Sequence, residues 1–124
     1  MNKKFDELKF NNINQINNQE LKYDDGRYIG QVINGKMEGK GIYYWNDGDR
    51  YEGDFKNNKA EGKGIYYYKS GNRYEGDWKN WKREGKGIFY YKNGDREMGD
   101  WKDNKGIGKH VILCKNGEVK TENY

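Results

Sequence analysis

The stretch from Tyr74 to Arg96 reads YEGDWKNWKREGKGIFYYKNGDR, and it decides the fold because the chain repeats it. Two earlier copies, YIGQVINGKMEGKGIYYWNDGDR (28–50) and YEGDFKNNKAEGKGIYYYKSGNR (51–73), place the leading tyrosine every 23 residues. A worn copy, EMGDWKDNKGIGKHVILCKNGEV, follows at 97–119. Self-similarity at a fixed period of this length predicts an array of small repeated units rather than an ordinary globular core.

Within one unit, aromatic residues and glycines alternate at a spacing of two, which is the period of a β-strand. We expect each unit to be a β-hairpin whose facing pairs are Trp78 with Gly85, Gly76 with Gly87, and Tyr74 with Phe89. Glycine is a poor strand residue, so its repeated use predicts that a neighbouring ring lies flat on the bare backbone.

The same register places opposite charges across the hairpin. It sets Asp77 opposite Lys86, and Asp54 opposite Lys63 one unit earlier. Such pairs are worth roughly 0.2–1 kcal/mol each, so they support the register without deciding it.

The strings YEGDW, GKGIYYY and NGDR closely resemble MORN (membrane occupation and recognition nexus) repeats, over residues 28 to 119. The family usually has His before GxG, whereas this chain has Glu38, Glu61, Glu84 and then Ile107. The family also usually has Gly in the first turn. That glycine survives only as Gly35 and becomes Asn58, Trp81 and Asn104 in the later units.

Composition taken alone favours disorder, because 35% of the residues are charged. The 16% aromatic content and the repeat argue the other way: layers of rings on glycines replace a globular core. The formal net charge of +4 falls on the two middle units and is interleaved with acids, which favours a solvated strand face over a nucleic-acid surface.

The turns between units predict how the hairpins join. The strings NDGD, KSGN, KNGD and KNGE mark these turns, and keeping the aromatic faces aligned requires an odd number of loop residues. A type I turn closed by a glycine bulge satisfies this, with positive φ at Gly48, Gly71, Gly94 and Gly117. We therefore expect an all-β fold, an elongated single-layer antiparallel sheet (an open β-solenoid) of successive hairpins.

The ends of the array depart from the repeat. Residues 1–20 are expected to form a short helical or irregular cap or a flexible arm, and 21–27 a partial repeat that supplies an extra strand or turn. Residues 28–119 hold four repeats, and 120–124 form a C-terminal tail. The apolar run Val111 to Cys114 needs cover, from a folded-back terminus or from a partner, and open ends would allow self-association.

Catalytic chemistry is not expected. His110, the sole histidine, stands where the repeat has glycine, so a structural or incidental role is favoured, and changing it to glycine could raise stability. Cys114 in an apolar strand predicts a buried thiol. Each GKG lies inside a strand and forms no phosphate loop. We expect no cofactor and no metal.

Location is indicated only broadly. Met1 to Phe10 contains acids and no long apolar run, so it predicts neither a signal nor a transit peptide. A single cysteine fits a reducing compartment, with the cytoplasm expected and cytoskeletal, ciliary or membrane association left open.

Two functions from different classes remain. The first, implied by the resemblance, is a non-catalytic scaffold whose aromatic-glycine groove binds an extended peptide or a partner subunit. The candidate groove residues are Tyr28, Tyr43, Trp45, Tyr51, Phe55, Tyr66, Tyr68, Tyr74, Trp78, Phe89, Tyr91 and Trp101. The candidate structural glycines are Gly30, Gly39, Gly41, Gly53, Gly62, Gly64, Gly76, Gly85, Gly87 and Gly99.

The second function, implied by the family name, is peripheral binding to anionic phospholipid. The bases expected to line one edge are Lys56, Lys59, Lys79, Lys82, Arg83 and Lys102. Trp81 occupies the tip of a turn, where it would either be exposed and contact a partner or a membrane, or fold sideways onto the turn of the adjacent hairpin.

Overall fold

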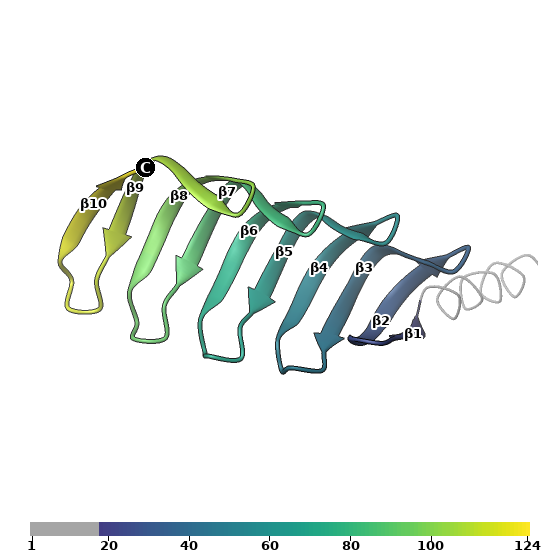
Figure 1. Cartoon of the computed structure of the whole chain (residues 1–124). Helices are drawn as coiled ribbons and strands as arrows, with labels where there is room; N and C mark the ends of the chain where they lie inside the picture. Colours follow the sequence, from purple (N-terminus) through teal and green to yellow (C-terminus); the bar gives the residue numbers. More distant parts are fainter. Residues whose placement is uncertain (1–17) are drawn as a thin grey trace, which may run out of the picture.

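Ten β-strands follow one another in a single antiparallel sheet, with each strand paired to its neighbours in sequence (Figure 1). The computed structural model describes residues 18–124, so the expected N-terminal cap lies almost wholly outside the described residues. The strands are β1 (Gln19–Tyr23), β2 (Gly26–Ile33), β3 (Lys36–Trp45), β4 (Arg50–Lys56), β5 (Lys59–Tyr67), β6 (Arg73–Lys79), β7 (Lys82–Tyr90), β8 (Arg96–Lys102), β9 (Lys105–Leu113) and β10 (Val119–Asn123). The predicted open sheet of successive hairpins is confirmed.

Two kinds of turn lie on opposite edges of this sheet (Figure 1). Turns within a unit are two-residue connections with positive φ at both residues, as at Asn57 (51°) and Asn58 (69°), which matches the twist of a hairpin. Turns between units place glycine at positive φ, with values of 105° at Gly48 and 103° at Gly71. The predicted closing glycines therefore hold, and they keep the aromatic faces of successive units on one side.

One predicted pairing is wrong. Tyr74 pairs with Phe89 and Gly76 with Gly87, but Trp78 faces Arg83 instead of Gly85. The register shifts because the chain forms a β-bulge at Gly85, where φ is 95°. Glycine adopts this conformation because it has no side chain. The bulge brings Arg83 to the same face as Trp78.

The predicted charge pairs are also corrected. Asp77 Oδ2 accepts a hydrogen bond from the backbone N–H of Lys86 at 3.0 Å, so these two residues do meet. The ammonium that pairs with Asp77 belongs instead to Lys63, on the strand of the preceding unit. Asp54 likewise pairs with Lys40. The bulge turns each aspartate toward the backbone of its own hairpin, so the ion pairs link neighbouring units.

The core is a row of tyrosine rings that lie on glycines. Tyr28, Tyr51 and Tyr74 are fully buried, and a Cβ atom at Gly87 would lie 2.0 Å from the hydroxyl oxygen of Tyr74. The same arrangement recurs at Gly41 and Gly64, so the predicted use of glycine as space for rings holds at these positions. We call the side of the sheet that bears these tyrosines the front face and the opposite side the back face.

The expected structural glycines divide into groups with different tasks. Those beneath or opposite the buried rings leave space, and they are Gly30, Gly41, Gly53, Gly64, Gly76, Gly87 and Gly99. Gly39, Gly62 and Gly85 instead supply positive φ at the bulges. Substitution is therefore excluded by crowding in the first group and by backbone conformation in the second.

The fourth unit continues the sheet with a different interior. Glu97 replaces the tyrosine, and His110 replaces the glycine beneath it. β10 begins at Val119, the expected last residue of the fourth repeat, and continues into the expected C-terminal tail. It pairs along β9 from Val119 opposite Leu113 to Asn123 opposite Lys109. The apolar end of β9 is therefore covered by the chain itself, which is the folded-back terminus that the sequence allowed. Cys114, expected to be buried, is half-buried at the turn that follows β9.

Candidate functional site

The expected groove residues on the front face fall into two sets that differ in burial. Those that pack over the glycine row are buried, and they are Tyr28, Tyr43, Tyr51, Phe55, Tyr74, Trp78 and Trp101. Their edge-to-face contacts, such as 5.2 Å between the ring centroids of Tyr51 and Trp78, link successive units. This set forms the core of the array, and of its members only Tyr43 also lines a hollow in the surface that contains Trp45 and Trp81.

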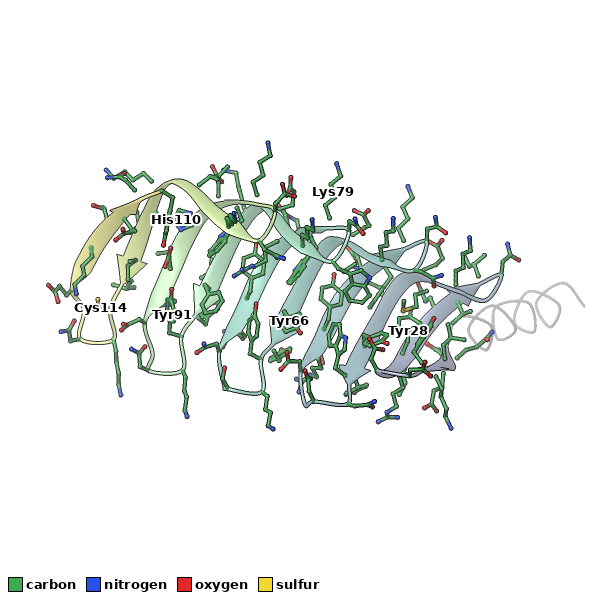
Figure 2. The ribbon with its side chains drawn as sticks, viewed as in Figure 1. Tyr28, Tyr66, Lys79, Tyr91, His110 and Cys114 are labelled. Atoms are coloured by element: carbon green, nitrogen blue, oxygen red, sulfur yellow. The ribbon has the colours of Figure 1, made fainter. Side chains whose placement is uncertain are left out.

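The second set remains accessible along one side of the front face. It comprises Trp45, Tyr66, Tyr68, Phe89 and Tyr91, which we call the aromatic ladder. Tyr66 and Tyr91 of this set are labelled in Figure 2. Its ring centroids are separated in order by 5.1, 4.5, 5.8 and 4.8 Å. The ladder therefore runs unbroken across three units, and Tyr91 at its end is 38% exposed.

Carboxylates of the inter-unit turns hold the ladder in place. Tyr66 donates its hydroxyl hydrogen to Asp49 Oδ2 at 2.8 Å, while Asp49 Oδ1 accepts the backbone N–H of Lys69 at 2.8 Å. Burial, followed by the hydrogen bond and charge of Asp49, raises the pKa of Tyr66. One unit later, Phe89 has no hydroxyl group and Asn72 replaces the aspartate, so the two positions differ together.

Of the two alternatives for Trp81, the structure shows the ring folded onto neighbouring residues and not exposed at the turn tip. Its indole folds back over the preceding units and contacts the rings of Tyr43, Trp45, Tyr51 and Phe55 at centroid distances of 5.4 to 5.8 Å. The indole N–H donates to the backbone oxygen of Asn58 at 3.2 Å. A half-buried ring is the result, because apolar neighbours lie within reach of this turn.

Arg83 likewise does not line the edge as expected. Its guanidinium lies 4.8 Å from the ring centroid of Trp101 and 5.8 Å from that of Phe89. Its Nη2 donates to the backbone oxygen of Asn104 at 2.6 Å. Arg83 therefore covers the front face of the fourth unit, where it forms cation–π contacts.

The remaining expected bases do form a row. Lys56 faces Lys59, and Lys79 faces Lys82, at the within-unit turns; Lys102 faces Lys105 at the next one. All of these side chains are exposed, and Lys79 points away from the sheet (Figure 2). Like charges directly opposite each other destabilise a hairpin unless a counter-charge is present. Asp103 approaches Lys82 at 4.0 Å.

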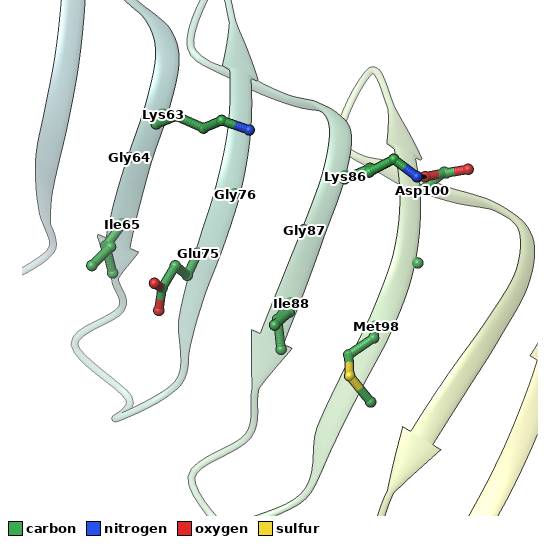
Figure 3. Close-up of a pocket in the computed structure, with 11 residues that line it drawn as sticks. Lys63, Gly64, Ile65, Glu75, Gly76, Lys86, Gly87, Ile88, Met98 and Asp100 are labelled. Atoms are coloured by element: carbon green, nitrogen blue, oxygen red, sulfur yellow. Dashed lines mark ion pairs between the residues drawn. The ribbon is translucent and has the colours of Figure 1, made fainter.

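The back face contains a hollow that the sequence reading missed. A furrow of about 690 Å³ crosses β5 to β8, with Gly64, Gly76 and Gly87 along its floor (Figure 3). Ile65, Ile88 and Met98 lie along one side of it, together with Glu75, and Lys63, Lys86 and Asp100 lie along the other. The isoleucine of each GKGI string could have indicated this furrow, because these isoleucines alternate onto the face that we expected to be solvated.

His110 is structural. It is fully buried, its Nδ1 lies 2.7 Å from Glu97 Oε2, and its Nε2 lies 2.8 Å from the backbone oxygen of Asp100. Glu97 also accepts the hydroxyl groups of Tyr91 at 2.8 Å and Tyr124 at 2.6 Å. These hydrogen bonds occupy both ring nitrogens, so the arrangement fixes the last unit and leaves no free base.

Residues 18–124 contain no group of three or more His, Cys, Asp or Glu side chains that could hold a metal ion. In the same range there is no helix with the length and apolarity needed to cross a membrane.

The fold and its aromatic face define a single-layer repeat protein built from β-hairpins. MORN repeats match residues 28–50, 51–73 and 74–96, more than half of the chain, and the protein belongs to the MORN repeat family. A comparison with curated proteins gave no match. MORN repeats are generally protein or membrane-lipid interaction modules. The hairpin β8–β9 extends the same sheet beyond the matched residues.

Proposed function

We propose that this protein is a non-catalytic scaffold that holds an extended segment of a partner protein along its aromatic ladder. The observation that carries the proposal is the continuity of accessible rings from Trp45 to Tyr91 across three units. Tyrosine and tryptophan supply contact area at low entropic cost and dominate protein interfaces. Neighbouring strands lie about 4.8 Å apart, so one hairpin advances the ladder by about 10 Å, a length that an extended peptide of about three residues spans.

Site-specific crosslinking tests this function. A photoreactive residue at Tyr68 should capture a partner from extracts of the source cell, whereas the same residue at Tyr67 should not. Tyr67 is the matched control because it lies next in sequence but faces the back, where Arg50 lies 3.9 Å from its ring centroid.

The captured segment then provides a direct affinity measurement. Synthesised as a peptide, it should bind the parent protein and lose at least about tenfold in affinity on Tyr68→Ala, as for an interface hot spot. Tyr67→Ala should leave binding intact. Equal capture at both positions, or equal binding by both variants, would contradict the proposal.

Peripheral membrane binding is the second candidate, and the row of facing lysine pairs favours it. Three successive turns present two exposed ammonium groups each, an arrangement suited to anionic headgroups. Sedimentation with phosphatidylserine vesicles tests it at low and at physiological salt. Scattered lysines should lose binding as screening increases. Lys79→Glu combined with Lys82→Glu should abolish any binding that remains. Binding that ignores both salt and charge reversal would exclude the lysine row.

A further inference from the structure

The aromatic ladder begins at a hollow with several aromatic walls. This hollow measures about 470 Å³, and Met37 and Asp25 complete its lining. Its rings, which we call the aromatic cage, are Tyr23, Tyr43, Trp45, Tyr66 and Trp81. Trp45 joins the walls, with centroid distances of 4.7 Å to Tyr43, 5.1 Å to Tyr66 and 5.4 Å to Trp81.

Carboxylates give the cage a negative character. Asp25 lines it directly and accepts the hydroxyl hydrogen of Tyr43, and Asp49 accepts that of Tyr66. Both phenols are protonated and neutral at neutral pH, as a phenol of ordinary pKa is, and burial and then these carboxylates raise their pKa values further. Neutral aromatic faces carry the negative side of the ring quadrupole. A cation entering the cage would therefore meet favourable groups on several sides.

The same surface already accommodates a cation elsewhere. Arg83 lies over the rings of Tyr74, Phe89 and Trp101 in the following units. Its counterpart two units earlier is Met37, which lines the cage and carries no charge. Within residues 18–124, the arginines that lie over rings contact other aromatic residues, so the cage lacks a cation like the one that Arg83 supplies in the third unit.

We propose that the aromatic cage binds the alkylammonium group of a lysine side chain, methylated lysine above all, in the partner segment that the ladder holds. This inference rests on the proposed function and names the chemistry of its partner. Aromatic cages recognise quaternary ammonium groups through cation–π attraction. Methylation removes the N–H donors of lysine and leaves its charge.

Tryptophan indole N–H resonances provide the readout, because the chain has four tryptophans. Choline is the probe, and its neutral carbon isostere 3,3-dimethylbutan-1-ol is the matched control, with ionic strength held constant. Choline should shift the Trp45 and Trp81 signals saturably. Trp78 and Trp101 serve as internal references, because their indole N–H groups bond to Gly64 and Gly87 inside the array. Equal shifts with the neutral isostere would overturn the proposal.

Two aspartate variants test the charge. Asp25→Asn keeps the size of the side chain and should weaken choline binding about fivefold, the effect of one nearby charge in water. Asp47→Asn is the control, since Asp47 lies outside the cage and bonds the backbone N–H of Asp49. Retained dispersion of the amide spectrum establishes that both variants fold. Unchanged affinity in Asp25→Asn would remove the carboxylate from the proposal.

Short peptides connect the cage to its ligand. Acetylated Gly-Lys-Gly amides carrying zero to three methyl groups on the lysine should bind with affinity that rises with methylation. Phosphatidylcholine vesicles present the same group from a lipid. If only the vesicles shift the Trp45 and Trp81 signals, the ligand is a headgroup and the lysine assignment is wrong.

The inference and the proposed function can fail separately. If the captured partner segment binds the parent and Asp25→Asn equally while choline shifts no tryptophan, the cage proposal is wrong and the scaffold stands. If choline binds but the Tyr68→Ala variant binds the captured segment as tightly as the parent does, the scaffold proposal is wrong. The claim that a partner protein supplies the lysine is then wrong as well.

Discussion

Glu97 and His110 occupy in the fourth unit the positions that Tyr74 and Gly87 hold in the third. In the third unit the ring comes from β6 and lies over a glycine of β7. In the fourth unit the ring comes from β9 and lies over a glycine of β8. A Cβ atom at Gly99 would lie 2.3 Å from the His110 ring. His110 Nδ1 lies 2.7 Å from Glu97 Oε2, and Nε2 lies 2.8 Å from the backbone oxygen of Asp100. The carbonyl oxygen of Asp100 can only accept, so Nε2 donates to it, and Nδ1 is left as a hydrogen-bond partner of the buried Glu97.

The first prediction reverses the expectation drawn from the repeat pattern. His110→Gly should destabilise the protein by about 3 kcal/mol, because it removes a hydrogen-bond partner from the buried Glu97 and leaves a cavity where the ring was packed. Adding Glu97→Tyr should recover most of this loss, because it restores the arrangement of Tyr74 and Gly87. Urea unfolding at neutral pH measures both. A single variant as stable as the parent would show that the pair contributes nothing.

The second prediction concerns acid. Burial raises the pKa of Glu97, but hydrogen bonds from Tyr124, Tyr91 and His110 outweigh it and hold the pKa below the ordinary value of 4.5. The resulting stabilisation is fully present above about pH 4.5 and is lost as pH falls through the lowered value. Unfolding free energies of the parent should therefore fall more steeply below pH 4.5 than those of the double variant Glu97→Tyr, His110→Gly. Parallel acid limbs would contradict this, since the other carboxylates are common to both proteins.

A third prediction tests the packing of rings on glycine. Gly87→Val should cost about 3 kcal/mol, the upper part of the range for overpacked cores, because the new side chain meets the hydroxyl of Tyr74. Ile88→Val, next in sequence and on the back face, should cost about 1 kcal/mol. Thermal melts of both variants compare them directly. The packing account requires the glycine variant to melt well below the isoleucine variant.

The fourth prediction concerns Trp81. Because its indole contacts four rings, Trp81→Asn should cost about 1–2 kcal/mol, more than the 0.5 kcal/mol typical of an exposed site. Part of the loss should be offset if the new amide accepts the backbone N–H of Ala60, as Asn58 does for Met37 at 2.9 Å. Asn58→Ala, which removes that bond, should cost about 1 kcal/mol. Chemical denaturation of both variants is the measurement, and a neutral Trp81→Asn would place the ring in solvent.

The repeated pattern was sufficient to predict the sheet, its two faces and the closing turns. Three units carry the same residues in register, so each local signal is tested three times within one chain. The bulge at Gly85 could not be predicted, because glycine is compatible both with a regular strand and with positive φ, and the sequence does not distinguish the two. Because of this bulge, Arg83 lies on the front face and not at the edge, and Asp77 forms its ion pair with Lys63 and not with Lys86.

The candidate site was predicted less well, because accessibility depends on contacts between units. Tyr74 and Tyr68 look alike in the sequence, yet Tyr74 lies on glycine and is buried while Tyr68 remains half-buried in the ladder. Trp81 could not be placed from its own turn, since the rings that receive it belong to the two preceding units. The pairing of Glu97 with His110 left a signal: both depart from the pattern in one unit, at positions that touch in the others.

The order of the strands has a mechanical consequence. The backbone hydrogen bonds between strands join strands that are adjacent in sequence, and these bonds run along the length of the array. A force that draws Gln19 and Asn123 apart therefore loads the hydrogen bonds of the terminal strands one after another and does not shear whole strands. Under tension the chain should peel from its ends in hairpin-sized steps at low force, and it should re-form by the reverse route. An array of hairpins of this kind should lengthen under load without any single cooperative rupture.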